Sequence, residues 1–418
     1  MALHKTMNFI YHRLISKKLI DLFNKPFVHI VFGARQTGKS TLIKSIIPPG
    51  TTVFDFSDPE ERGRHTQNPG EFAAVCKALP RGTHRYVFVD EAQSVPSVFD
   101  AVQNLYDSDK ERWRFILCGS SARKLRKAKA NLLPGRSFLH HVQPLTMMEH
   151  PFLDGDPRPL VIPVEDEKGK DDFAFPSWPL MDRLAYGSLP GIVASDEDDR
   201  KRLLRGYVAL HLEEEIRREA LVRDLGAFLR FLRLAAVESG NIVNHSSIAK
   251  EVGVTTSTVL SHYQLLEDMF IGFSVLPYHG SGRRTLVKSP RFIFFDTGVR
   301  NAAAGFTPSA DTVLASPGPL FEQWVGAELH RRLVYLDKGS LFYLRTHNGF
   351  EIDYIVEING ELIPIEVKWT EHPCAKDARN IAVFMSDHEN AGRGYVVCRC
   401  PRPMELSERI LAIPWWAL

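Results

Sequence analysis

The sequence predicts a multidomain α/β protein with a mainly parallel β-sheet. Its 418 residues exceed what one compact core needs, and at about 100–200 residues per domain they indicate two to four domains. In the first third of the chain, helix-compatible segments alternate with short apolar runs of strand length at 28–32, 52–56, 86–89 and 115–117. This alternation is typical of a parallel sheet with helices on both faces.

The chain divides into segments of different character. An amphipathic helix is expected over 8–24, inside a first α/β domain. The expected segments are 1–150 as the α/β domain, 151–180 as a Pro-rich and acidic insertion or linker, 181–290 as a helical lid and middle domain, and 291–418 as a mixed α/β domain.

The composition excludes several classes of protein. Hydrophobic residues make up 44% and charged residues 24%, which are globular values and exclude wholesale disorder. The net charge of +2 means that nucleic-acid binding must come from local patches. Five scattered cysteines argue against a disulfide scaffold. With neither a signal-peptide core nor an apolar run of about 18 residues, the sequence predicts a cytoplasmic protein with no membrane span.

A phosphate-binding loop follows the first apolar run. Residues 33–40, GARQTGKS, match G-x-x-x-x-G-K-[ST] between a predicted strand and a predicted helix. The glycines allow backbone N–H groups to face phosphates, Lys39 reaches the β- and γ-phosphates, and the Ser40 hydroxyl is a ligand for Mg²⁺. The residues expected to bind the nucleotide are Gly33, Ala34, Arg35, Gln36, Thr37, Gly38, Lys39, Ser40 and Thr41.

Two later strand ends complete a hydrolytic site. The run YVFVDE places Asp90 to hold Mg²⁺ through water and Glu91 to polarise the attacking water. The run RFILCGSS places Ser120 to hydrogen-bond the γ-phosphate or the water, although a polar turn at a strand end has the same pattern. The set predicts hydrolysis as well as nucleotide binding.

These motifs, in the order GARQTGKS, VFDFSDPE, YVFVDEAQ, ILCGSSARKL and PGRSFLHHVQPLTMMEH, resemble those of the archaeal and bacterial AAA+-type ATPases that carry a C-terminal domain of unknown function. The resemblance spans nearly the whole chain except 151–180. It implies ATP as the nucleotide, a homo-oligomer, and an arginine that one subunit inserts toward the γ-phosphate of another. Arg136 matches that arginine, and a fold-stabilising surface arginine is the alternative.

The middle segment resembles a winged helix-turn-helix. Helix-compatible residues on both sides of Gly253 precede a predicted hairpin, and DNA readout is weighed against a lid or an interaction module. The side chains expected to face a DNA groove are Thr255, Thr256, Ser257 and His262. Two basic stretches without acids suit phosphate backbones or a solvated loop: Arg123, Lys124, Arg126, Lys127, Lys129 and Arg136 in the first, and Arg283, Arg284, Lys288 and Arg291 in the second.

The last segment carries a second set of acids. Strand alternation puts Glu351 and Asp353 on one face, and Glu366 and Lys368 on one face of the next strand after an Asn359-Gly360 turn. Asp353 and Glu366 are expected to bind Mg²⁺, and Lys368 to orient or activate a water. Exposed cross-strand charge pairing would give the same alternation.

A helix before these strands supplies a further acid. Glu322 is expected to complete the metal site, with Glu328 as its substitute. The order of helix acid, strand Asp and strand E-x-K resembles the PD-(D/E)xK nucleases with a restriction-endonuclease-like fold. No Pro precedes Asp353, which departs from their pattern. Folds outlive their chemistry, so activity of this domain stays a separate question.

These observations lead to two functional hypotheses. The preferred one is an ATP-hydrolysing AAA+-type protein that remodels, translocates along or processes DNA, with a metal-dependent nuclease domain. The alternative is a nucleotide-driven switch or scaffold that binds protein partners and whose nuclease-like domain is inert. Sequence-specific transcription control through the helix-turn-helix is a third and weaker hypothesis.

Overall fold

The computed structural model describes residues 12–82, 84–120, 135–150, 159–162, 177–212, 216–217, 222, 224–279 and 288–418. The chain forms two compact units. Unit 1 comprises 1–143, 166–175 and 268–270, and unit 2 comprises 144–165, 176–267 and 271–418.

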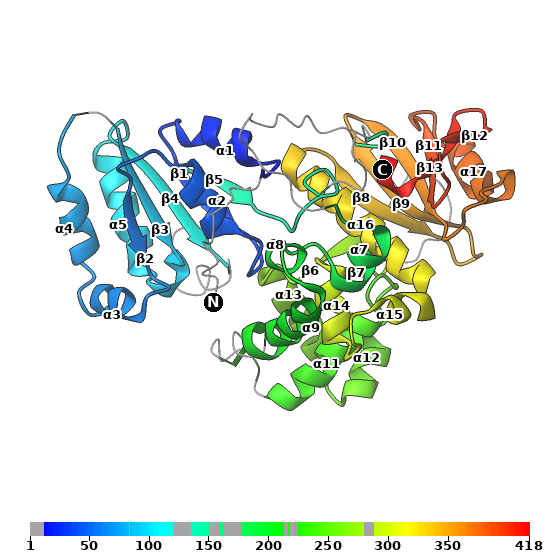
Figure 1. Ribbon diagram of the computed structural model, residues 1–418, viewed down its shortest axis with the longest axis horizontal. Helices are drawn as coiled ribbons and strands as arrows, with labels where there is room; N and C mark the ends of the chain where they lie inside the picture. The colour runs from blue at the N-terminus through cyan, green and yellow to red at the C-terminus, as the bar shows by residue number, and fades with distance from the viewer. Residues whose placement is uncertain are drawn as a thin grey trace, which may run out of the picture. The chain divides into compact units, whose positions relative to one another are not determined.

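Unit 1 is built on a five-stranded sheet in the order β2-β3-β4-β1-β5 (Figure 1). Its strands are β1 (Val28–Phe32), β2 (Thr52–Asp55), β3 (Arg85–Asp90), β4 (Trp113–Gly119) and β5 (Ser137–His141). Every pair of neighbours is parallel. This confirms the predicted parallel sheet, and the predicted apolar runs coincide with β1 to β4 to within two residues at each end.

Helices connect these strands. They are α1 (Ser16–Phe23), α2 (Lys39–Ile46), α3 (Pro59–Gln67), α4 (Glu71–Ala78), the short 3₁₀ helix η1 (Ala92–Ser94) and α5 (Ser97–Ser108). Gly38 stands at the N-cap of α2 with φ +83°, in the left-handed region that glycine enters without steric cost. Of the helix expected over 8–24, residues 12–24 are described, and α1 covers 16–23 of them.

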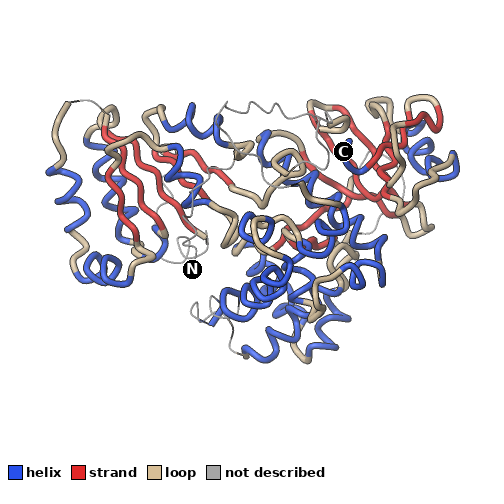
Figure 2. Tube along the Cα trace, viewed as in Figure 1, coloured by secondary structure: helices blue, strands red, loops and turns tan. Residues whose placement is uncertain are grey.

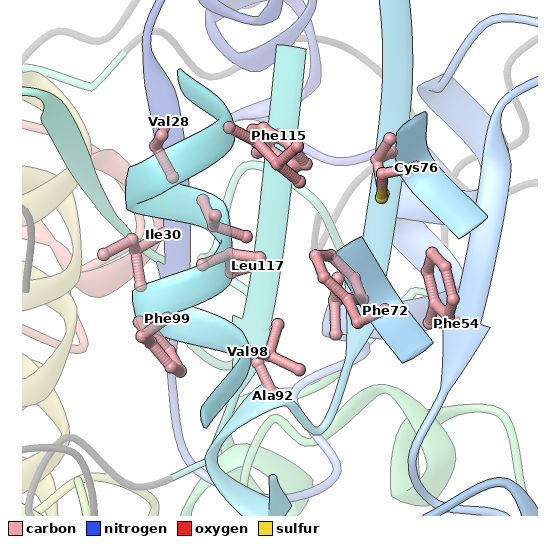
Figure 3. Close-up of a cluster of buried hydrophobic side chains, with 14 of the residues drawn as sticks. Val28, Ile30, Phe54, Phe72, Cys76, Ala92, Val98, Phe99, Phe115 and Leu117 are labelled. Carbon is pink, nitrogen blue, oxygen red and sulfur yellow. The ribbon is translucent and has the colours of Figure 1, made fainter. Parts of the chain in front are cut away.

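One apolar layer of unit 1 lies between the sheet and two helices. Alternate residues of β1, among them Val28 and Ile30, join the core cluster with Phe115 and Leu117 of β4. Figure 3 shows Phe72 and Cys76 of α4 and Phe99 of α5 gathered around the same layer. Burial of these side chains fixes the sheet that presents the phosphate loop, since each large apolar side chain contributes about 1.5–3 kcal/mol.

Unit 2 contains an eight-stranded mixed sheet, in the order β12-β13-β11-β10-β9-β8-β6-β7 (Figure 2). Its strands are β6 (Gly272–Pro277), β7 (Arg291–Phe294), β8 (Ser340–Arg345), β9 (Glu351–Ile358), β10 (Glu361–Val367), β11 (Gly394–Cys398), β12 (Met404–Ser407) and β13 (Ile410–Pro414). β9 and β10 form the predicted antiparallel hairpin, and Asn359 and Gly360 both have positive φ in its turn.

Helices of unit 2 precede and flank this sheet. They are α7 (Leu180–Tyr186), α8 (Pro190–Val193), α9 (Glu197–Gly206), the π-helical η2 (Tyr207–Leu212), α11 (Leu225–Val237), α12 (His245–Val252), α13 (Thr256–Asp268), α14 (Thr297–Ala303), α15 (Ala310–Ala315), α16 (Pro317–Leu336), α17 (Arg379–Asp387), and the 3₁₀ helices η3 (Ala375–Ala378) and η4 (Trp415–Ala417).

The predicted helix, turn and helix are α12 and α13. The Asn244 side chain caps α12 by accepting from the Ser247 N–H, and Gly253 ends it with φ +80°. β6 and β7 follow as an antiparallel pair, whose connecting residues 280–287, with Arg283 and Arg284, lie outside the described residues. The prediction that His262 faces outward is wrong, because it is buried against Phe228 and Phe231 of α11.

The structure differs from the expected segment boundaries. Residues 144–150, expected in the first domain, belong to unit 2, where Leu145 N donates to Ser188 O at 2.9 Å. The β6–β7 pair spans the boundary expected at 290/291, and β6 joins the sheet through β8. Of the expected linker, Val161 and Ile162 are buried in unit 2, while 151–158 and 163–176 lie outside the described residues.

Among the residues that the structure describes, no helix is long and apolar enough to cross a membrane. All five cysteines are free thiols, as their scattered spacing predicts.

Candidate functional site

The phosphate loop lies at the carboxyl end of the parallel sheet in unit 1, between β1 and α2. The Lys39 ammonium is buried and donates to Gly33 O at 2.9 Å and to Ala34 O at 2.7 Å. A Cβ on Gly33 would lie 2.3 Å from Val142 O, so only glycine fits there. The loop therefore keeps its lysine inside the ring of backbone that would surround a phosphate.

An arginine from the N-terminal region supports this loop. The buried Arg13 guanidinium donates to Thr37 O at 2.8 Å and to Gln143 O at 2.8 Å. The Thr37 hydroxyl donates to Ala34 O at 3.0 Å, so both contacts fix the loop backbone. Sequence reasoning missed Arg13, because nothing in its local pattern shows which distant carbonyls it meets.

The predicted magnesium ligands of unit 1 are in contact. Ser40 Oγ donates to Asp90 Oδ1 at 2.8 Å, across from α2 to the end of β3. Lys44 Nζ lies 3.7 Å from Asp90 Oδ2 and 3.2 Å from Asp55 Oδ2 at the end of β2. Hydroxyl and carboxylate oxygens are the donors that Mg²⁺ takes in nucleotide sites, so this pair fits that ion.

Glu91 is held by a residue that the sequence reasoning did not single out. Glu91 has φ +51°, an uncommon value for a residue other than glycine. The buried Gln93 amide donates to Glu91 Oε2 and, at 3.2 Å, to Ser120 Oγ. A Cβ on Gly119 would lie 2.3 Å from Gln93 Oε1, so this glycine makes room for the amide. Gln93 thus brings Glu91 and Ser120 together.

Arg136 lies at the other end of the sheet. β5 begins at Ser137, level with Val28 at the start of β1, and Arg136 O accepts from Val28 N. The phosphate loop follows Phe32, four residues farther along β1, which at roughly 3.3 Å per residue is about 13 Å away. Arg136 Nε contacts Asp107 Oδ1 at 2.7 Å near the surface of unit 1.

Unit 2 brings Asp353 and Glu366 together on β9 and β10. Asp353 Oδ2 accepts from Val367 N at 2.8 Å, and Lys368 Nζ donates to Glu366 Oε2 at 2.8 Å. Burial, and secondly the Asp353 charge, raise the pKa of Glu366 to about 8. Burial is the largest single effect on Lys368 and lowers its pKa, but the charges of Glu366 and Asp353 together with the Glu366 hydrogen bond raise that pKa above its usual value. The two side chains of the E-x-K sequence, at the end of β10, are therefore in contact with each other.

Glu322, the third expected metal ligand, pairs with an arginine of β7. Its Oε1 accepts from Arg291 NH1 at 2.5 Å, and Arg291 NH2 contacts Glu351. Burial and the Asp353 charge raise the pKa of Glu322 to about 7. In the described parts of the chain, no group of three or more His, Cys, Asp or Glu side chains is arranged to hold a metal ion. The expected set of Glu322, Asp353 and Glu366 is thus close together but not assembled as three ligands.

Glu328 lies in the interior of unit 2. It lies six residues after Glu322 on α16 and is fully buried. Its carboxylate accepts from Arg332 Nε at 2.8 Å and from Met147 N at 3.0 Å. The Arg332 contact lies within α16, and the Met147 contact anchors the segment after residue 143 to this helix, so Glu328 has a structural role.

Comparison with known families agrees with the class that the fold and site of unit 1 define. Residues 25–150 match the AAA domain model, which supports an AAA-type P-loop nucleotide-binding ATPase domain. Residues 178–310 and 317–418 each match a domain of unknown function, DUF8612 and DUF4143 respectively.

Similar proteins are known across most of the chain. Uncharacterized proteins of Mycobacterium tuberculosis and Mycobacterium bovis are each 24% identical over 408 residues, covering 97% of this chain and 84% of the relative. An uncharacterized protein of Haemophilus influenzae is 24% identical over 375 residues, covering 84% of both chains.

Two solved structures are also similar to this chain. A DNA polymerase III gamma subunit-related protein of Thermotoga maritima covers 61% of this chain and 97% of its own, with 13% identity and a TM-score of 0.25. Protein VC1899 of Vibrio cholerae covers 93% and 94%, with 13% identity and a TM-score of 0.18. TM-scores this low carry no argument about function.

Proposed function

We propose that unit 1 binds ATP with Mg²⁺ and hydrolyses it. The hydrogen bond from Ser40 Oγ to Asp90 Oδ1 carries this proposal, because it joins the end of the phosphate loop to the acid that ends β3. Bound Mg²⁺ supplies neutralisation of the charge that develops on the transferred phosphoryl group. Lys39 leaves its two carbonyl partners and pairs with the β- and γ-phosphates.

The water that attacks the γ-phosphorus needs a base. Glu91 is the candidate, and it accepts the proton of that water as the new P–O bond forms and ADP leaves. Ser120 lies within reach of the same region through Gln93 and would hydrogen-bond the γ-phosphate or the water. Gly33 to Thr41 supply the remaining backbone and side-chain contacts to the nucleotide.

Arg136 would act on the nucleotide of another copy of the chain. Its place at the amino end of β5 puts it roughly 13 Å from its own phosphate loop along the strand. An arginine that stabilises the transferred phosphoryl group must reach it directly, so Arg136 fits this role only across a homo-oligomeric interface. The Asp107 contact would hold the guanidinium until then.

The substrate on which the ATPase acts is proposed to be DNA. Support comes from the helix-turn-helix of α12 and α13 with the β6–β7 pair after it, an arrangement that winged-helix proteins use in a DNA groove. Thr255, Thr256 and Ser257 are exposed at the start of α13, where such proteins contact bases. The first basic stretch lies outside the described residues except for Arg136.

Metal-dependent cleavage of a phosphodiester is a second candidate function, located in unit 2. The contact between Lys368 and Glu366 beside Asp353 favours it, because this is the arrangement of PD-(D/E)xK nucleases. The orphaned Glu366 Oε1 and the carboxylate beside it are oxygen donors that suit Mg²⁺. Lys368 would orient a water toward the phosphorus.

One assay tests both candidates. ATP hydrolysis by the purified chain is measured in Mg²⁺ without DNA and with duplex, single-stranded or branched DNA, and the DNA is checked for nicks. Lys39→Ala removes the phosphate contact in unit 1, and Glu366→Ala removes the acid in unit 2. Each variant serves as the matched control for the other, because they alter separate units.

The outcomes separate the hypotheses. DNA-stimulated hydrolysis that is lost in Lys39→Ala and kept in Glu366→Ala supports a DNA-coupled ATPase. Nicks that disappear in Glu366→Ala add the nuclease. Slow hydrolysis that no DNA stimulates, with no nicks, would favour the nucleotide-driven switch that binds protein partners.

A further inference from the structure

Arg291 is a buried cation that β7 contributes to the acidic cluster of unit 2. Its side chain is 4% exposed and contacts Glu322 Oε1 at 2.5 Å, Glu351 Oε1, and the Asp353 backbone oxygen at 3.3 Å. The guanidinium also lies 4.8 Å from the centre of the Tyr343 ring. A guanidinium binds two carboxylates well because its donors form a rigid planar fork.

The cluster holds more negative than positive charge. With all four carboxylates ionised, two cations, the buried Arg291 and the partly exposed Lys368, face Glu322, Glu351, Asp353 and Glu366. Two negative charges are left over, which is the charge that one divalent cation balances. Arg345 also lies 3.8 Å from Glu351, but it is half-exposed, so water screens its charge.

Arg291 pairs with Glu322 and Glu351, and Lys368 contacts one oxygen of Glu366, which leaves the other Glu366 oxygen and the Asp353 carboxylate. Glu366 is 3% exposed, and its Oε1 is buried without a hydrogen-bond partner. The Asp353 carboxylate lies beside it, and one of its oxygens accepts a hydrogen bond from the Val367 N–H. Burying two adjacent carboxylates without a hydrogen-bond donor between them destabilises the folded state, and a bound cation would remove this destabilisation.

We propose that Arg291 is the resident cation of this cluster, held by Glu322 and Glu351, and that Asp353 and Glu366 alone bind one divalent metal ion. The inference rests on the second candidate function above and changes the role of Glu322. Glu322 becomes a positioning residue that acts through Arg291, which also agrees with the lack of any three-acid metal arrangement in the described residues.

The role of Glu322 can be measured by metal binding alone. Mn²⁺ is the probe, because it accepts the same oxygen ligands as Mg²⁺ and its free aqua ion is counted by electron paramagnetic resonance. All proteins are full chains in an Asp90→Asn background, which removes the predicted carboxylate ligand of unit 1. The variants are Asp353→Asn, Glu366→Gln, Glu322→Gln, Arg291→Met and the double variant Arg291→Met/Glu322→Gln.

The double variant is the matched control for charge. It removes one cation and one carboxylate together, so the two leftover negative charges stay. If Asp353 and Glu366 are the ligands, the double variant binds one Mn²⁺ about as tightly as the parent. Asp353→Asn and Glu366→Gln weaken binding by more than about 100-fold, and Glu322→Gln weakens it by about 10-fold, the lower end of the roughly 10- to 100-fold typical of outer partners. Arg291→Met alone binds more tightly.

Other results overturn the proposal in distinguishable ways. If Glu322→Gln and the double variant lose Mn²⁺ binding as fully as Asp353→Asn, Glu322 is a metal ligand. That result would support the metal site and contradict the role proposed for Arg291. If the parent binds no Mn²⁺, both this inference and the nuclease candidate fail, and the ATPase proposal is untouched. Thermal unfolding of each variant, with Arg291→Lys as the charge-conserving replacement, shows whether lost binding reflects lost folding.

Discussion

At the residue scale, the proposed ATPase step depends on how Glu91 is held. A base must point at the water it deprotonates, and small errors of position cost large factors in rate. The Gln93 amide fixes one Glu91 oxygen and leaves the other for water, while the same amide reaches Ser120. Gln93 is therefore a positioning residue for the proposed base and not a group that contacts the nucleotide.

Gln93→Met tests this role, because methionine keeps the length and volume of glutamine and removes only its hydrogen bonds. We expect kcat for ATP hydrolysis to fall about 10- to 100-fold, since the base loses its orientation. The KM for ATP should change little, because Lys39 and Ser40 are intact. Steady-state kinetics measure both values. A higher kcat in Gln93→Met would mean that the amide restrains Glu91 instead of aligning it.

Sequence patterns located the residues that local rules govern. Strand alternation predicted Glu366 and Lys368 on one face, and the structure has them in contact. The spacing around Lys39 predicted a phosphate contact, which stays a prediction. Arg291 could not be assigned in the same way. It reaches Glu322 and Glu351 from a strand 31 and 60 residues earlier in the chain, and no local period encodes that pairing.

At the scale of elements, β1 and β5 share a buried histidine pair. His29 Nδ1 lies 3.1 Å from His140 Nε2, and the Phe23 ring of α1 packs against His29. Burial, as the largest cause, lowers the pKa of His29 to about 4 and that of His140 to about 3. Both rings are therefore neutral in the folded unit at physiological pH.

This pair makes the stability of unit 1 depend on pH. In the unfolded chain both histidines take up protons below about pH 6.5, whereas the folded pair resists until pH 4 or below. Stability is therefore full above pH 6.5 and falls as the pH drops, by up to about 1.4 kcal/mol per pH unit for each histidine. Urea unfolding between pH 7 and 5 measures this slope.

A variant identifies the source of that slope. In His29→Phe/His140→Phe, two rings of similar size no longer titrate, so the fall of the urea midpoint between pH 7 and 5 should become shallower than in the parent. The exposed His347→Gln serves as control. An equal slope in parent and double variant would assign the pH dependence to other groups.

Helix α13 shows that helical periodicity is sufficient to predict which of its side chains are buried. Val259, His262, Tyr263 and Leu266 are buried on α13 at the i, i+3, i+4, i+7 spacing, so helical periodicity contained the evidence against an outward His262. No sequence pattern of this kind indicates that β6 pairs with β8. Parallel pairing between strands separated by more than 60 residues depends on tertiary packing, which composition and turn residues do not reveal.

At the scale of the whole molecule, the sequence predicted more segments than the structure has compact units. Changes of composition at 151 and 181 indicated boundaries, yet buried residues on both sides of them belong to unit 2. Composition reports solvent exposure along the chain, whereas a domain is defined by contacts between distant segments. In the activity proposed for unit 1, the arginine would come from another copy of the chain.

That requirement predicts complementation between two inactive variants. Arg136→Ala should lower kcat by about 10³-fold or more, and Lys39→Ala should abolish hydrolysis. In a 1:1 mixture that assembles at random, about one quarter of all sites combine an intact phosphate loop with an intact Arg136 from the neighbour. We therefore expect the mixture to recover up to roughly a quarter of the parent rate, measured as phosphate release against total protein.

Asp107→Asn is the matched control, because it breaks the surface pair of Arg136 and leaves the guanidinium in place. Such pairs contribute about 0–1 kcal/mol, so this variant should keep both its stability and its hydrolysis rate. Recovery in the mixture would place Arg136 at a neighbour's nucleotide and make oligomerisation part of the active site. A mixture as inactive as its components, or an Arg136→Ala protein as active as the parent, would assign Arg136 to the surface of unit 1.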